Sequence, residues 1–180
     1  WHMHGDEALL RYTRKLDRVT LTPRQLRVTE AEISGAFQHL DPKFALQLKS
    51  AIQNVLAFYG RPRRRPVKML DGDGVVLGEK FDPIERVGIY IPGGTASLGS
   101  TVYMTVIPAQ RAGVKRIILA TPPRKDGSVN PHILAVASLL DVDEVYRMGG
   151  AQAIAAMAFG TKAIPKVDKI LGPGNAYVAE

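Results

Sequence analysis

The 180-residue sequence contains no cysteine. Disulfide bonds, thiolate metal ligands and a thiol nucleophile are therefore excluded within it. Long hydrophobic runs are also missing: no apolar stretch approaches the roughly 18 residues that a membrane-spanning helix needs, and no secretory signal peptide opens the chain. Because hydrophobic residues make up 46% and charged residues 23%, the composition is that of a globular protein. We expect a cytoplasmic protein with no membrane partner.

Several signatures of enzymes and nucleotide-binding proteins are absent as well. The glycines Gly93, Gly94 and Gly99 do not form GxGxxG, and no Gly-Lys-Ser/Thr sequence forms a P-loop. No Ser-His-Asp set or pair of carboxylates is evident, and the four histidines do not have the spacing of zinc ligands. We therefore predict no catalytic residue and no metal site within residues 1–180.

Positive charge is in excess, with 24 Lys and Arg against 17 Asp and Glu and a formal net charge of +7. Much of the excess lies in Arg61-Pro62-Arg63-Arg64-Arg65. A basic nucleic-acid-binding module is therefore one hypothesis. However, the run contains no aromatic residues, so the stacking surface of single-strand binders is missing. We favour a solvated loop and expect no nucleic-acid partner.

The first sixty residues are predicted to form an N-terminal helical segment. Residues 5–17 have apolar side chains at helical spacing. Thr29 and Glu32 have the spacing of a capping box at the start of a second helix, and Asp41-Pro42 suits the start of a third. Val19 to Val28 is predicted to be a polar connection. The apolar faces of these helices require a partner elsewhere in the chain.

The remainder of the chain changes character twice. Residues 61–83 are predicted to be a basic loop and a first extended segment, with Gly74–Phe81 and Ile84–Ile91 paired as a hairpin. From residue 84 to 180, extended segments alternate with helical ones. This alternation predicts the α/β class, a Rossmann-like parallel sheet built from βα repeats.

Three polar side chains lie beside glycine turns at the predicted strand ends. Tyr90 precedes such a turn, and Gln152 and Asn175 each follow one. The carboxyl ends of parallel strands share one edge of a sheet, which is where ligands bind in open α/β sheets. Each residue also has a structural interpretation: Tyr90 as a core aromatic, Gln152 as a surface residue and Asn175 as a helix cap. Because all three fall on one edge, we favour a ligand-binding rim.

Four stretches of the sequence carry a resemblance to a known family. GIYIPGGTASLGSTVYM, PAQRAGVKRIILATPP, GGAQAIAAMAFGT and VDKILGPGNAYVAE resemble histidinol dehydrogenase in order and spacing, and GDEALLRYTRKLD resembles the N-terminal helix of that family. One departure is Gly99, where members often carry proline. Both ends of the chain look cut, so we expect a piece of a longer polypeptide.

The resemblance implies a zinc-dependent, NAD-linked homodimer with intertwined subunits. Such an enzyme oxidises L-histidinol through L-histidinal to L-histidine with two NAD molecules, the last step of histidine biosynthesis. Carried over by motif, the NAD-binding residues are Tyr90, Gln152 and Asn175. The zinc ligands and the acid–base pair are expected beyond residue 180, so the chain alone is predicted to be inactive. A related dehydrogenase of another small alcohol is the alternative.

Overall fold

The computed structural model describes residues 5–60, 66–70, 73–93, 99–142 and 144–173. Its centre is a four-stranded sheet made of β3 (Arg86–Tyr90), β4 (Arg116–Thr121), β5 (Val145–Arg147) and β6 (Lys169–Leu171). All neighbouring pairs are parallel, and the spatial order is β5-β4-β3-β6. Strands β4 and β5 are added in turn on one side of β3, and β6 is then added on its other side. This is the strand order of one half of a Rossmann fold. The predicted α/β class is confirmed.

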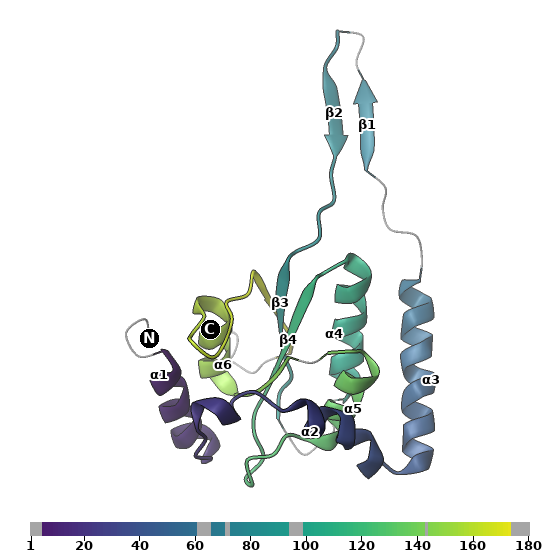
Figure 1. Cartoon of the computed structure of the whole chain (residues 1–180). Helices are drawn as coiled ribbons and strands as arrows, with labels where there is room; N and C mark the ends of the chain where they lie inside the picture. Colours follow the sequence, from purple (N-terminus) through teal and green to yellow (C-terminus); the bar gives the residue numbers. More distant parts are fainter. Residues whose placement is uncertain (1–4, 61–65, 71–72, 94–98, 143, 174–180) are drawn as a thin grey trace.

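Helices cover both faces of this sheet (Figure 1). One face carries α2 (Glu30–Gly35), α3 (Pro42–Tyr59), α4 (Gly99–Ala112) and α5 (Pro131–Leu139). The other carries α1 (Gly5–Tyr12) and α6 (Gly150–Phe159). Side chains alternate between the two cores along each strand, so Ile89 packs with the first set and Tyr90 with the second. The sheet is buried on both sides, as parallel sheets require.

The predicted helix starts are confirmed by their capping hydrogen bonds. Thr29 accepts from the backbone of Glu32 at 3.3 Å, and the Glu32 carboxylate accepts from the backbone of Thr29 at 2.9 Å. Asp41 accepts from the backbone of Phe44 at 2.9 Å at the start of α3. Each cap satisfies N–H groups that a helix leaves unpaired at its first turn.

The segment predicted as a polar connection is more ordered than expected. Pro23–Gln25 forms a 3-10 turn, and Leu26 and Val28 are fully buried. The backbone of Val28 donates to Val145 at 2.8 Å, and that of Arg147 donates to Leu26 at 2.7 Å. The polar interpretation was wrong because this short stretch lies alongside β5 and buries its alternate apolar side chains.

A hairpin is present, but the prediction of which two segments form it is wrong. Residues 84–91 do not pair with 74–81, because β3 (Arg86–Tyr90) lies within them and pairs in parallel with β4 and β6. The antiparallel hairpin instead joins β1 (Val67–Leu70), in a stretch predicted to be loop, to β2 (Val76–Glu79). This pair, which we call the arm, projects away from the helices and the sheet (Figure 1).

The N-terminal helices pack directly on the alternating βα region. Helix α3 lies against α4, and α1 lies against α6. The proposed division at residues 60 and 83 stays a prediction. No helix in the described ranges is long and apolar enough to cross a membrane.

Candidate functional site

The order of the sheet reverses between β3 and β6, and ligands of open α/β sheets bind beyond the strand ends at such a point. Here the two strands end in close contact. Gly172 has φ +142°, and a Cβ added to it would lie 2.1 Å from the carbonyl oxygen of Tyr90. A side chain at position 172 would therefore force the end of β6 away from the end of β3.

Tyr90 ends β3 and reaches across to the start of α6. The residue is 4% exposed and belongs to the core on the α1–α6 side, as expected for a core aromatic. Its hydroxyl oxygen also accepts a hydrogen bond of 3.0 Å from the backbone N–H of Gly150. Burial, together with the nearby charge of Asp17, raises the pKa of the Tyr90 hydroxyl, so it stays protonated at neutral pH.

Gln152 lies in the first turn of α6 and is 4% exposed, so its interpretation as a surface residue is wrong. Its Nε2 donates to Oδ2 of Asp17 at 3.0 Å. Its Oε1 is buried without a hydrogen-bond partner among the described residues. A buried acceptor left unpaired costs about 1–3 kcal/mol. This oxygen is therefore an acceptor at the strand ends that a hydrogen-bond donor would satisfy.

Asp17 was not predicted, although it completes this cluster. It is the last residue of a π-helical turn, Thr13–Asp17, that continues α1. Half-burial of the carboxylate raises its pKa, an effect that the hydrogen bond from Gln152 opposes. An acidic residue at the carboxyl end of a helix is unfavourable for the helix dipole. That misplaced charge was the one signal in the sequence that could have drawn attention to Asp17.

The ends of β4 and β5 close the cluster through Pro122, which follows β4, and Gly149, which follows β5. A Cβ at Gly149 would lie 2.8 Å from Cβ of Pro122 and 3.0 Å from Oδ1 of Asp17. The sequence offered no acid at the end of β4, where many dinucleotide sites hold a ribose hydroxyl. The carboxylate of this cluster comes instead from Asp17, in the N-terminal helical segment, which lies beside Gly149 and Gln152. We call Asp17, Tyr90, Gly149, Gly150 and Gln152 the strand-end cluster.

The third predicted residue, Asn175, lies outside the described residues. Gly172 and Pro173, which precede it by a few positions, are described and follow β6 beside Tyr90. The structure therefore brings Tyr90 and Gln152 to the same strand edge, while the placement of Asn175 stays a prediction.

No metal centre was predicted in this chain, and the described part of it contains no group of three His, Asp or Glu side chains able to hold an ion. His132 is half-buried near the start of α5, where its ring packs on Phe44 at 4.7 Å. A cavity of about 240 Å³ lies beside these rings and is lined mainly by apolar side chains of α3, α4 and α5. This histidine has no acidic partner within hydrogen-bond distance in the described residues.

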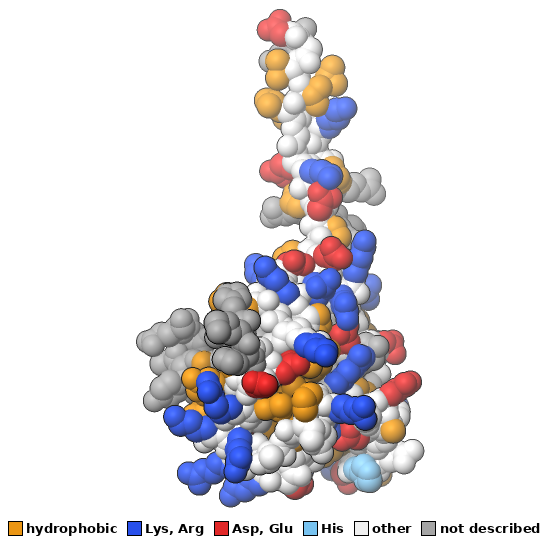
Figure 2. Space-filling view, turned by 60° about the vertical axis from the view of Figure 1, so that its left-hand side comes forward, with side chains coloured by type: hydrophobic (Ala, Val, Ile, Leu, Met, Phe, Trp, Pro, Cys, Tyr) orange, Lys and Arg blue, Asp and Glu red, His pale blue; other side chains and the backbone are white. Residues whose placement is uncertain are grey.

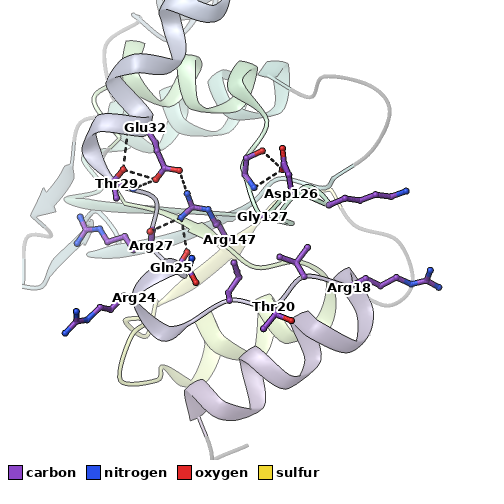
Figure 3. Close-up of a pocket in the computed structure, with 14 residues that line it drawn as sticks. Arg18, Thr20, Arg24, Gln25, Arg27, Thr29, Glu32, Asp126, Gly127 and Arg147 are labelled. Carbon is purple, nitrogen blue, oxygen red and sulfur yellow. Dashed lines mark hydrogen bonds and ion pairs between the residues drawn. The ribbon is translucent and has the colours of Figure 1, made fainter.

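A larger cavity, of about 570 Å³, lies between the residues that follow α1 and the 125–128 loop (Figure 3). Arg147 lines this cavity. Its guanidinium pairs with Glu32 and donates to the carbonyl oxygens of Gln25 at 2.9 Å and Arg27 at 3.0 Å. Burial alone would raise the pKa of Glu32, but hydrogen bonds from Arg147 and Thr29 outweigh it and lower that pKa.

The other cations around this cavity are arranged differently. Figure 3 shows the side chains of Arg18 and Arg24 pointing away from Arg147 and from each other. They do not converge on one point where an anion would bind. We therefore interpret the Arg147 contacts as a clamp that joins the N-terminal helical segment to β5.

Comparison with known proteins gives a consistent result. A family model described as histidinol dehydrogenase matches residues 2–180. Histidinol dehydrogenase of Bacillus cereus is 49% identical over 174 residues, and that of Listeria monocytogenes is 50% identical over 175 residues. Each alignment covers 97% of this chain and 40% of the relative. The chain thus spans about 40% of the length of these curated relatives.

A solved structure agrees with the sequence relatives. The crystal structure of histidinol dehydrogenase from Elizabethkingia anophelis matches with a TM-score of 0.90 and 44% sequence identity. The match covers 96% of this chain and 40% of that chain. With a family model that spans nearly every residue and relatives close to half identical, the chain belongs to the histidinol dehydrogenase family.

Proposed function

We propose that this chain holds NAD at the strand-end cluster and forms the cofactor-binding part of an enzyme that oxidises L-histidinol. The reaction passes through L-histidinal to L-histidine and consumes two NAD molecules. It is the last step of histidine biosynthesis, and we place it in the cytoplasm and in a homodimer. Family membership and the geometry of the strand ends support this assignment.

The observation that carries the proposal is Oε1 of Gln152, which has no hydrogen-bond partner among the described residues. It is a buried acceptor at the start of a helix, beside the point where the sheet reverses order. A dinucleotide presents hydroxyl and amino donors that would satisfy it, and the N–H groups of Ala151 and Gln152, which follow Gly150 in the first turn of α6, suit a phosphate. The residues present therefore fit the cofactor that the family implies.

Tyr90 is suited to orient the same ligand. Its hydroxyl accepts from Gly150 and is held in the neutral form by burial, so its own proton is available for donation. Asn175 is proposed to complete the set from the turn after β6. Together these groups would bind and orient the cofactor, which provides the hydride acceptor when bound.

Zinc is a different case. Zinc sites in catalysis need three protein ligands, and the described residues offer no such set. We therefore assign no step to a metal in this chain and place the zinc ligands and the acid–base pair beyond residue 180. The purified chain, supplied with histidinol, NAD and zinc, is expected to form no NADH. Turnover above background would contradict this division of the active site.

Two alternative functions stay open to test. A relative that oxidises another small alcohol would bind NAD in the same way, and assays of a full-length enzyme on histidinol and other alcohols separate the two. A nucleic-acid-binding module would depend on Arg61–Arg65, which lies outside the described residues. A gel-shift assay over a range of salt concentrations tests it, and we expect only weak binding lost at moderate salt.

The direct test of the proposal is calorimetric titration of NAD into the wild-type chain and its Gln152→Ala variant. Losing one buried polar contact should weaken binding roughly 5- to 150-fold, which corresponds to about 1–3 kcal/mol. Asn175→Ala should have an effect in the same range. Gln53→Ala, an exposed glutamine on α3, is the control and should bind like the wild type. Equal affinity of the wild type and Gln152→Ala would remove the cluster from the site.

A further inference from the structure

We infer that Asp17 is a positioning residue for the cofactor, because it fixes the side-chain amide of Gln152 so that Oε1 is left for a hydrogen-bond donor of the ligand. The inference rests on the proposed NAD site. It adds a residue from outside the βα region to that site, and it states which kind of ligand group Gln152 receives.

The argument begins with the chemistry of the two side chains. A glutamine amide has a donor end and an acceptor end of nearly the same shape, so packing alone does not choose between its two orientations. An ionised carboxylate can only accept hydrogen bonds. With Asp17 on one side, only Nε2 of Gln152 can face it, and the 3.0 Å contact has this arrangement.

The other end of the amide then has a defined direction. A Cβ added to Gly150 would lie 3.0 Å from Oε1 of Gln152 and 3.8 Å from its Nε2. The oxygen is therefore the end nearer to the first residue of α6, the residue whose N–H donates to Tyr90. Because Oε1 accepts, its partner is a hydroxyl or amino group of the dinucleotide and not a phosphate oxygen.

The location of Asp17 supports a functional role over a purely structural one. Its carboxylate lies at the unfavourable end of a helix and is half-buried, and Gly149 is the residue that leaves space for it. An apolar or amide side chain would fill that space without burying a charge. What the charge adds is control of the orientation of Gln152.

The competing explanation is that Asp17 only anchors the N-terminal helix to α6. Asp6 provides a matched control for that role. It lies on the same helix, and its Oδ1 accepts from the backbone of Ala163, just after α6, at 3.1 Å. Asp6→Ala thus removes a comparable anchor without changing a contact of Gln152.

The experiment measures NAD affinity for the wild-type chain, Asp17→Ala, Asp17→Asn, Asp6→Ala, Gln152→Ala and the Asp17→Ala/Gln152→Ala double variant. Asp17→Ala should weaken binding roughly fivefold or more, and Asp6→Ala should change it less than about twofold. Asp17→Asn keeps the shape of the side chain but permits both orientations of the Gln152 amide. Its NAD affinity should lie between those of Asp17→Ala and Asp6→Ala. The double variant should bind no worse than Gln152→Ala, because both substitutions act on one contact.

A second readout needs no cofactor. The side-chain amide resonances of Gln152 in the free chain should move and exchange faster in Asp17→Ala, and should be unchanged in Asp6→Ala. Unchanged resonances in Asp17→Ala, additive losses in the double variant, or an equal loss in Asp6→Ala would each overturn the positioning role. If the wild type bound no NAD, the proposed function would fail first, while the amide resonances would still show whether Asp17 controls Gln152.

Discussion

Strands β2 and β3 are both short and rich in aliphatic residues, yet their environments are opposite. Leu77 on the arm is 64% exposed, whereas Ile89 in the sheet is fully buried. In the part of the chain that the structure describes, the two strands of the arm pair only with each other, while β3 has a strand on each side and a helical layer on each face. Burial in this chain therefore comes from tertiary partners and not from the composition of a strand.

The comparison extends to the whole surface of the arm. Its large apolar side chains are all exposed: Val67, Met69, Leu70, Val76 and Leu77. Figure 2 shows hydrophobic side chains along the arm, and Lys and Arg spread over the body below it. An isolated two-stranded hairpin is only marginally stable in water. The strand-end cluster, in contrast, depends on the packed sheet, and the same substitution should have different effects in the two regions.

The largest difference is expected for truncation of an aliphatic side chain. Ile89→Ala leaves a cavity in the core and should lower the free energy of unfolding by about 3–4 kcal/mol. Leu77→Ala removes a side chain that is mostly in water and should change it by less than about 0.5 kcal/mol. Urea unfolding followed by circular dichroism measures both. Equal losses would mean that the arm is packed in solution.

Ion pairs should show the same contrast. Arg147→Met removes the donor of two backbone carbonyls and of Oε1 of Glu32, and should cost about 2–3 kcal/mol. This is less than for a fully buried pair because Glu32 is partly exposed and keeps its hydrogen bonds from Thr29. Lys80→Met breaks the solvated 2.7 Å pair with Asp82 just beyond β2 and should leave the melting temperature unchanged. A negligible effect of Arg147→Met would contradict the clamp between the N-terminal segment and β5.

Substitutions at two glycines with positive φ distinguish the cost of backbone strain from the cost of a steric clash. Gly172→Ala places a methyl group against the carbonyl of Tyr90 and should cost roughly 2 kcal/mol or more, with weaker NAD binding. Gly74→Ala, in the turn of the arm with open space around it, should cost only about 1 kcal/mol of strain and leave NAD binding unchanged. Unfolding and titration data on both variants make the comparison, and equal effects on NAD binding would remove the β3–β6 contact from the site.

The smallest expected effect is on pH dependence. Burial raises the pKa of the Asp17 carboxyl in the folded chain. Between the ordinary pKa of the unfolded chain and this raised pKa, the folded chain therefore holds a proton that the unfolded chain has released. The free energy of unfolding falls as pH rises through this range. NAD affinity should change in the opposite direction and increase across that window as Asp17 ionises. Tyr90, the titratable neighbour, stays neutral there. Asp17→Asn should flatten both profiles, and a flat wild-type profile would contradict the role of the charge.

Local patterns in the sequence were sufficient for the helices, for the parallel strands and for placing Tyr90 and Gln152 at one edge of the sheet. Caps such as Thr29 and Asp41, and glycine turns after strands, depend on neighbouring residues and were read correctly. The pairing partner of residues 84–91 was predicted wrongly, because an apolar strand between turns fits a hairpin and a buried parallel sheet equally well. Asp17 was missed for a similar reason. Its contact with Gln152 joins residues 135 positions apart, and such a distance leaves no periodic pattern.

The central claim, that the strand-end cluster binds NAD, is tested most directly by adding NAD to the ¹⁵N-labelled chain and following its amide resonances. The account predicts saturable shifts at the backbone of Gly150 and the side chain of Gln152, with those of Met69 and Leu77 on the arm unchanged. Shifts centred on the arm, or none at the cluster at saturating NAD, would contradict it.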